Sequence, residues 1–402
     1  MPKLKRDLTV EQQLARGPLD LPFLMLVVLL TAIGVIMVFS ASYATAVGEG
    51  KAATYYFSRQ AIFAVSGLAI MYAISKINYQ QFRTGSMIVL GGALLLLVAV
   101  LLPGIHTARD DGVRRWIRSI GPLPSFQPSE VAKLGVIMYF SARISKRNTE
   151  KLPRRDTRTL KGMLQKLGDD WGLTELIPYA AILLIIIVLM YFEPHMSGTI
   201  LILIAAASIL FVGGVKLRWF AIGGTAVVSL LALIITNTNY MSARMALWQH
   251  PEEFPRDGGY QILQSLYAIG SGGLFGVGFG RGRQKQGFLP EAENDFIFSN
   301  VCEEMGMIGA GLILLLFALL IIRGYWIALH SRDRFGSVLV VGVVTLMAAQ
   351  VFLNISVVTN LLPTTGVSLP FFSYGGTALW IQLAEMGIVL SVSRQVKAPR
   401  QG

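Results

Sequence analysis

The chain has 402 residues, and its 35 Lys and Arg against 23 Asp and Glu give a formal net charge of +12. Hydrophobic residues make up 53% of the chain and charged residues 14%, with a mean hydropathy of +0.58. Ordinary soluble domains contain about 25% charged residues. The composition therefore excludes a typical soluble enzyme, and recurring apolar runs of about 20 residues predict an all-α polytopic membrane protein.

The residue types also exclude several kinds of site. Cys302 is the only cysteine, so the chain can form no internal disulfide. The four histidines are scattered and lack the spacing of a zinc site. A basic balance also occurs in nucleic-acid binders, but the sorting of basic residues to one side of a membrane accounts for it here, so we expect no nucleic-acid partner.

The first apolar run starts near Leu21, after residues 1–19 with their several Lys and Arg, and continues for more than 20 residues. The apolar core of a signal peptide is shorter, about 7–15 residues, and is followed by a cleavage site of small residues. We therefore predict a retained membrane span, preceded by a cytoplasmic tail of residues 1–19.

Windows of about 19 residues on a hydropathy scale predict about ten transmembrane helices. They form one domain, residues 20–393, followed by a tail at residues 394–402. An even number of spans places both termini on the same side of the membrane. The predicted spans are residues 20–43, 57–76, 84–102, 129–146, 176–192, 199–215, 219–236, 300–322, 336–357 and 376–393.

The segment 143–175 determines the predicted orientation because it contains the densest group of basic residues. Cytoplasmic loops are enriched in Lys and Arg and lie beside anionic lipid. We therefore place this segment and both termini in the cytoplasm. The group consists of Arg143, Lys146, Arg147, Lys151, Arg154, Arg155, Arg158, Lys161 and Lys166.

Two predicted outer segments, residues 103–128 and 237–299, are unusually long, and the second connects predicted helices 7 and 8. Loops of more than about 15 residues in a compact protein are usually functional or disordered. Residues 258–276 are apolar with helical spacing, so disorder is not expected there. Since this stretch is short and broken by glycine, we predict a re-entrant or surface-lying helix.

Ionisable residues inside apolar spans are costly and usually mark a function. Glu130 and Lys133 are three residues apart, so they share one face of a helix and can pair. Two interpretations remain open for this pair, a functional site and a structural ion pair between helices. The ionisable residues within or at the ends of predicted spans are Arg59, Glu130, Lys133, Glu303, Glu304 and Glu385.

The segment 276–298 contains several glycines, then cations, then carboxylates, directly before a predicted helix. Its glycines match neither a Walker A motif nor a dinucleotide fold. Asp295 precedes an apolar helix and is expected at the membrane boundary, where desolvation raises the pKa of a carboxylate and suits it to act as a general base. The alternative is that Asp295 is a helix N-cap.

Residues 360–377 contain two prolines and several glycines, which exclude a continuous helix. We expect a broken loop at membrane depth, a form that is tolerated where it lines a cavity or is buried in protein. A substrate wall and a structural plug are both consistent with this pattern. Ser373 and Tyr374 are the candidate cavity-lining residues.

Four co-linear patterns resemble the SEDS family (shape, elongation, division and sporulation), which includes RodA, FtsW and SpoVE. The resemblance covers nearly the whole chain, and the Thr-Gly and Phe-Phe-Ser-Tyr patterns are more similar to the FtsW/SpoVE branch. One departure is Glu293-Asn294, where many members have His-Thr before the Asp. The four patterns lie at residues 126–133, 259–273, 289–304 and 362–376.

The resemblance implies a peptidoglycan glycosyltransferase that polymerises lipid II at the outer face of the bacterial plasma membrane. It also implies a class B penicillin-binding protein as partner, besides membrane lipids. The Asp that matches Asp295 is essential in the family. By the same resemblance, Arg59, Glu130 and Lys133 match family residues.

The reaction requires one group that removes a proton and others that stabilise a departing diphosphate. We expect Asp295 to be the base and Arg59, Lys133 and Lys285 to contact diphosphate, with Glu130 orienting Lys133. A divalent cation, Mg²⁺ or Mn²⁺, is a candidate cofactor, although the sequence identifies no ligands for it. The alternatives are a lipid II flippase and a noncatalytic scaffold that activates a penicillin-binding protein.

Overall fold

The structure is a computed structural model that describes residues 17–107, 114–119, 125–146, 172–237, 245–254 and 258–396. Almost all of the predicted tail 1–19 and most of the basic segment 143–175 lie outside the described residues. The same holds for most of the predicted tail 394–402.

The described residues are mainly helical, which confirms the predicted all-α class. Each of the ten predicted spans overlaps one long helix. Extended pairing among the described residues is limited to single bridges of Ile117 with His106 and with Phe126. The helices are α2 (Leu21–Gly48), α3 (Tyr55–Lys76), α4 (Gln80–Leu101), α5 (Pro128–Lys146), α7 (Leu173–Phe192), α8 (Met196–Val212), α9 (Leu217–Asn237), η1 (Pro251–Glu253), α11 (Gly258–Gly272), α12 (Ile297–His330), α13 (Arg334–Val358) and α14 (Gly376–Val396).

Six helices of the described chain are long and apolar enough to cross a membrane, namely α2, α3, α4, α12, α13 and α14. Shorter apolar stretches lie in α7 and α8, at Leu176–Phe192 and Met196–Val212. Helix α5 contains Glu130 and Lys133 in its first half and is buried along most of its length by other helices. The protein is thus a multi-pass membrane protein, and the number of ten spans remains a prediction.

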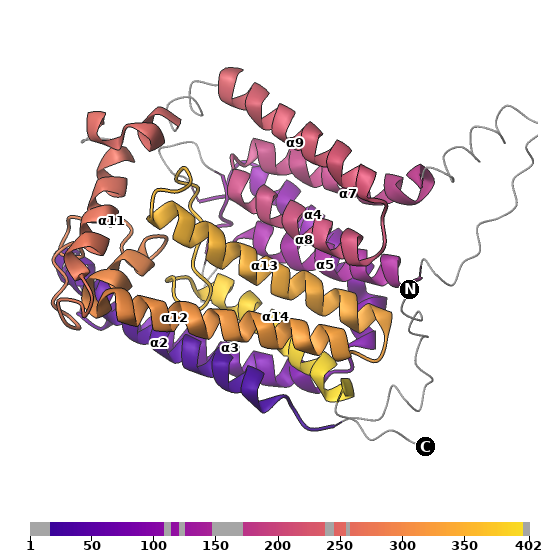
Figure 1. Cartoon of the computed structure of the whole chain (residues 1–402), viewed down its shortest axis with the longest axis horizontal. Coiled ribbons are helices and arrows are strands. Elements are labelled where there is room, and N and C mark those ends of the chain that lie inside the picture. The colour runs from indigo at the N-terminus through magenta and orange to yellow at the C-terminus, as the bar shows by residue number, and fades with distance from the viewer. Residues whose placement is uncertain are drawn as a thin grey trace, which may run out of the picture.

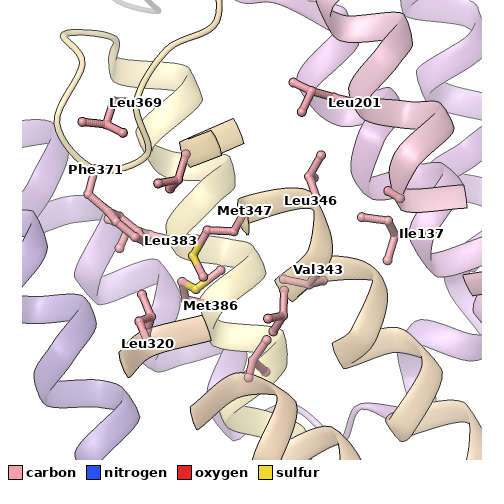
Figure 2. Packing of buried hydrophobic residues seen from close by; sticks show 14 of the residues in the cluster. Ile137, Leu201, Leu320, Val343, Leu346, Met347, Leu369, Phe371, Leu383 and Met386 are labelled. Atoms are coloured by element: carbon pink, nitrogen blue, oxygen red, sulfur yellow. The ribbon is translucent and has the colours of Figure 1, made fainter. Parts of the chain in front are cut away.

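Helix α13 lies at the centre of the bundle (Figure 1), where it packs against α12, α8 and α5. Helix α3 packs along α14, and α4 packs along α5. Because a helix surrounded by others buries all of its faces, α13 carries apolar side chains around its whole circumference. Figure 2 shows Val343, Leu346 and Met347 of α13 between side chains of α5, α8, α12 and α14.

Helix α12 is broken at Gly306, whose φ of 65° and ψ of −171° are not helical. A break leaves backbone groups without their helical partners. The segment 273–278 satisfies them: Val277 and Gly278 donate their N–H groups to the carbonyls of residues 303 and 304, at 2.9 and 3.1 Å. The glycine-rich stretch therefore binds the backbone of α12.

We predict that Gly306→Ala destabilises the protein strongly. The φ of Gly306 disfavours any other residue, and a Cβ there would lie 2.3 Å from the backbone nitrogen of Gly276. Thermal unfolding in detergent should show that the free energy of unfolding is lower by about 1–3 kcal/mol or more. Gly311→Ala in the same helix is the matched control, because a Cβ there meets nothing within 4 Å; equal unfolding temperatures for both variants would contradict the prediction.

Candidate active site

A cavity of about 1140 Å³ opens at the end of the bundle where α12 and α14 begin. It is lined by residues from α3, α5, α8 and α14, by the described residues between 107 and 127, and by the loops before α12 and α14, with one glutamine each from α11 and α13. Six residues singled out in the sequence meet there, although they come from four separate segments. They are Arg59, Glu130, Lys133, Asp295, Ser373 and Tyr374.

Asp295 lies in the wall of this cavity and is partly exposed. The N-cap position of α12 is occupied by Phe296, whose side chain makes no capping hydrogen bond. The alternative interpretation of Asp295 as the N-cap is therefore not what the structure shows. A Cβ added to Gly366 would lie 3.3 Å from Oδ2 of Asp295, so the carboxylate faces the loop before α14 at close range.

The backbone on which Asp295 lies is held by three consecutive carbonyl groups, those of residues 293–295. They accept hydrogen bonds from Tyr374 N at 2.9 Å, Ser373 Oγ at 2.8 Å and Asn354 Nδ2 at 2.8 Å. Since the acceptors are backbone atoms, the presence of Glu293-Asn294 in place of His-Thr leaves this arrangement unaffected. The loop that carries Asp295 and the loop before α14 therefore form one connected wall.

The loop before α14 is the broken loop that the sequence predicts, and it is held by buried amides. Gln60 of α3 is fully buried; its Nε2 donates to Ser373 O at 3.2 Å, and its Oε1 accepts from Gly375 N at 3.4 Å. Gln382 Oε1 accepts from Phe371 N at 3.1 Å. The loop is thus both internally supported and part of the cavity wall.

Glu130 and Lys133 form the pair that their spacing predicts, with Nζ and Oε2 2.7 Å apart. Both side chains are less than 10% exposed, and both line the cavity. Desolvation largely offsets the attraction in a buried pair, so the pair is weak evidence for a purely stabilising role. Its geometric effect is to hold an ammonium group in the wall of the cavity.

Arg59 is exposed and lines the cavity near the aromatic side chains of Tyr55 and Tyr374. Its guanidinium lies 4.7 Å from the centre of the Tyr55 ring. Burial raises the pKa of Tyr374, and a hydrogen bond with Arg59 opposes that shift. The Tyr374 hydroxyl therefore stays protonated, and a neutral donor lies beside a cation.

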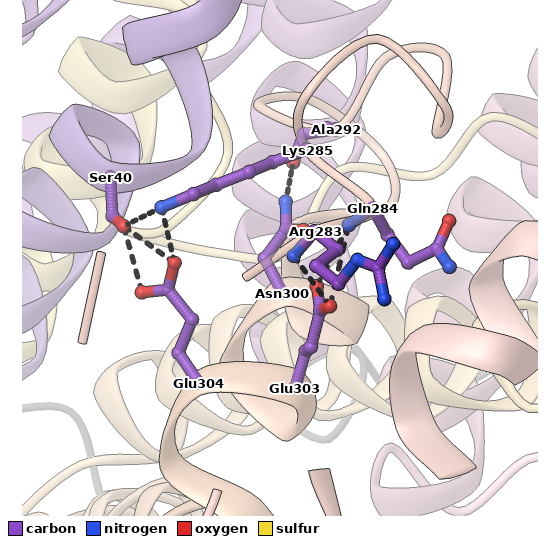
Figure 3. Close-up of polar contacts among 8 residues, drawn as sticks. All are labelled: Ser40, Arg283, Gln284, Lys285, Ala292, Asn300, Glu303 and Glu304. Carbon is purple, nitrogen blue, oxygen red and sulfur yellow. Dashed lines mark hydrogen bonds and ion pairs between the residues drawn. The ribbon is translucent and has the colours of Figure 1, made fainter. Parts of the chain in front are cut away.

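Lys285 does not line the cavity, which corrects the prediction that it contacts diphosphate. Its ammonium group donates to Ser40 Oγ at 2.7 Å and pairs with Glu304, and its side chain is 5% exposed (Figure 3). Glu303 accepts from the backbone N–H of Arg283 at 2.7 Å. Because a buried carboxylate needs donors, Lys285 compensates a charge inside the protein.

Loss of the Lys285–Glu304 pair should destabilise the fold. We expect Lys285→Met to lower the free energy of unfolding by about 3–5 kcal/mol, because the substitution leaves the Glu304 carboxylate buried without its cation. Lys285→Met combined with Glu304→Gln should recover part of the loss in thermal unfolding. Lys51→Met, which removes an exposed ion pair with Glu49, is the control and should leave unfolding unchanged; a similar loss in both single variants would contradict this role.

The cavity wall contains a further polar group that was not predicted from the sequence, formed by Arg115, Gln127 and His195. Arg115 donates through Nε to the carbonyl of Glu193 at 3.4 Å and through Nη2 to that of Pro194. Gln127 Nε2 lies 3.4 Å from His195 Nε2. These residues fall outside the predicted spans, so the search for charges within apolar runs did not select them.

Two buried titratable groups lie at the turn between α7 and α8. Burial raises the pKa of Glu193 to about 8, and both of its carboxylate oxygens lack a hydrogen-bond partner among the described residues. Burial, together with Arg115 and Lys133, lowers the pKa of His195 to about 3. Both groups are therefore mainly neutral at pH 7. The turn thus contributes little negative charge that would offset the cations of the cavity wall.

The pH dependence of stability should reveal Glu193. Its pKa is higher in the folded chain than in the unfolded one, so its contribution to the free energy of unfolding falls as pH rises towards 8. The pKa of His195 is lower in the folded chain, so the contribution of His195 is fully present above pH 6.5 and does not change in that range. Between pH 6.5 and 8 we expect Glu193 to lower the free energy of unfolding by up to about 1.4 kcal/mol per pH unit. Glu193→Gln should remove that slope in chemical denaturation; an unchanged slope would contradict the assignment.

No group of three or more His, Cys, Asp or Glu residues in the described ranges is arranged to hold a metal ion. The carboxylates of the cavity wall are Glu130, Glu291 and Asp295. Glu130 is paired with Lys133, and Glu291 accepts a hydrogen bond from Asn294. A cation in this cavity would therefore need ligands from a bound substrate as well as from the protein.

Solved structures contain chains with a similar fold. A chain from the structure entitled "Structural coordination of polymerization and crosslinking by a peptidoglycan synthase complex" is 26% identical, with a TM-score of 0.72, over 96% of this chain and 99% of that one. The rod shape determining protein RodA of Thermus thermophilus is 25% identical, with a TM-score of 0.64, over 94% of this chain and 97% of that one.

Comparison of sequences gives closer relatives. A probable peptidoglycan glycosyltransferase FtsW of Geobacter metallireducens is 39% identical over 94% of this chain and 95% of its own length. Stage V sporulation protein E of Bacillus subtilis is 38% identical over 93% and 97%. The model of the cell cycle protein family of FtsW, RodA and SpoVE matches residues 21–398, and the chain therefore belongs to that family.

Proposed function

We propose that this protein is a peptidoglycan glycosyltransferase that polymerises lipid II at the outer face of the bacterial plasma membrane. The observation that carries the proposal is the position of Asp295 in the wall of a large cavity that also contains Arg59 and Lys133. Relatives named as probable peptidoglycan glycosyltransferases FtsW, matched along nearly their whole length, support it.

The chemistry assigns a role to each part of the wall. A sugar hydroxyl of one lipid II attacks the anomeric carbon of another lipid-linked glycan, a new C–O bond forms, and the bond to the diphosphate breaks. Asp295 accepts the hydroxyl proton as general base. Arg59 and Lys133 stabilise the negative charge on the departing diphosphate, and Glu130 fixes the position of Lys133.

The size and polarity of the cavity fit this substrate class. A volume of about 1140 Å³ exceeds the roughly 300–1,000 Å³ of sites for drug-sized ligands. Uncharged groups such as Gln127, Thr364 and Ser373 line it together with the cations. Such a mixture suits a ligand that combines a diphosphate with sugar and amide groups.

A divalent cation, Mg²⁺ or Mn²⁺, is part of the proposal as a cofactor. When bound, such an ion neutralises charge on the leaving diphosphate. Asp295 would hold it from the protein side, together with diphosphate oxygens. The protein would thus contribute to the ion site the Asp295 carboxylate, on a backbone that hydrogen bonds hold in place.

A class B penicillin-binding protein is the proposed partner. A chain of similar fold comes from a structure whose title describes a peptidoglycan synthase complex that coordinates polymerization and crosslinking. The alternatives are less well supported. A flippase should have polar groups through the middle of the membrane, whereas the polar wall here gathers at one end of the bundle. A noncatalytic scaffold would not need a carboxylate and cations facing one cavity.

Glycan polymerisation by the purified protein tests the function. We expect Asp295→Asn to reduce polymer formation from lipid II by about 10²–10⁴-fold, because the amide cannot accept the proton. Glu252→Gln in the exposed 3₁₀ helix η1 is the matched control and should retain activity. Polymerisation at the parent rate by Asp295→Asn would remove Asp295 from the mechanism, and transbilayer movement of lipid II without polymer would favour the flippase.

A further inference from the structure

The segment Gly273–Phe288, between α11 and the loop that carries Asp295, exposes large apolar side chains. Leu274, Phe275, Phe279 and Phe288 each expose more than half of their surface, and Phe275 exposes 80%. An apolar group of this kind usually contacts a membrane or another protein. The position of the segment relative to the bilayer distinguishes between the two.

We infer the edges of the hydrocarbon layer from two polar contacts that join α12 to α2 and its N-cap. Asp20 pairs with Arg323 at one end, and Ser40 donates to Glu304 at the other, both at 2.7 Å. On each helix about 20 residues separate these contacts, and at about 1.5 Å per residue the separation is about 30 Å, the thickness of a hydrocarbon core. The Ser40–Glu304 contact therefore lies near the face opposite to that of Asp20.

Backbone hydrogen bonds place the apolar segment at this same level. Met307 N donates to Gly273 O at 2.9 Å, and Ile308 N donates to Leu274 O at 3.1 Å. Met307 and Ile308 are 64% and 48% exposed, on a helix apolar enough to cross a membrane. Leu274 and Phe275 therefore lie beside lipid-facing residues at the edge of the hydrocarbon layer.

Exposed cations, Arg281 and Arg283, directly follow Leu274, Phe275 and Phe279 along the chain, and Phe288 comes after them. Lipid phosphates lie directly outside the hydrocarbon layer, and guanidinium groups bind phosphate oxygens through paired hydrogen bonds. The order of apolar residues and then cations thus matches the order of acyl chains and then phosphates in one leaflet. This match of chemistry and level favours lipid as the occupant of the surface.

We propose that the segment Gly273–Phe288 is an interfacial anchor in the outer leaflet. Leu274, Phe275 and Phe279 enter the boundary of the acyl chains, and Arg281 and Arg283 bind lipid phosphates. Because the segment is bonded to α12 and continues into the loop of Asp295, the anchor fixes the depth of that loop relative to the lipid headgroups. The proposal does not depend on the reaction catalysed.

Site-directed spin labelling of the full chain in nanodiscs tests the anchor. The single native cysteine is removed by Cys302→Ser, and nitroxides are attached at Phe275→Cys or Phe279→Cys. We expect the ratio of oxygen to nickel-chelate collision rates at both sites to lie within about twofold of that at Met307→Cys, and about tenfold above that at Glu252→Cys. The Met307 and Glu252 sites are the lipid and water references.

The cations are tested in the same labelled proteins. In bilayers that contain phosphatidylglycerol, Arg281→Gln with Arg283→Gln should lower the collision ratio at residue 279 by about twofold or more. Arg114→Gln, an exposed Arg outside the segment, is the matched control and should have no effect. Thermal unfolding verifies that each labelled variant is folded.

Two results would overturn the proposal. Labels at residues 275 and 279 with the water exposure of the Glu252 reference in bilayers would show that the segment stays in solvent. Labels that become protected only after a class B penicillin-binding protein is added would assign the surface to a protein partner.

Discussion

The buried carboxylates of Glu303 and Glu304 determine how the chain before α12 folds. Carboxylates in a low-dielectric interior are costly unless donors surround them. The donors come mainly from one loop: the backbone N–H groups of Arg283 and Gln284, and the ammonium group of Lys285. Because this loop is tied to the start of α12 at several points, the residues that follow it, including Asp295, have a defined place at the cavity.

Much of the fold could be predicted from the sequence because apolar runs of sufficient length produce spans wherever they occur. The Glu130–Lys133 pair was predictable for the same local reason, since residues three apart share a helical face. Lys285 was misassigned because its partners are not local: Ser40 precedes it by 245 residues, and Glu304 follows it by 19. Spacing along a loop does not determine which buried acid a lysine meets.

The uncharged part of the site was not predictable for a different physical reason. Gln60 and Asn354 lie in apolar helices, where a single amide changes the hydropathy of a window very little. Their importance arises from the carbonyl groups that other segments bring to them, and those segments are distant in sequence. Glu193 and His195 lie in a short turn that a search for spans treats as solvent-exposed, whereas both are buried.

Asn354 gives the central helix a mechanical role. Its amide nitrogen, on α13, donates both to the carbonyl of Asp295 at 2.8 Å and to that of Val367 at 2.7 Å. The loop before α14 is also bound to Gln60 of α3, the neighbour of Arg59. Through this loop, the helix that holds the base is connected to the helix that carries a cation, so a displacement of either helix would be transmitted to the other.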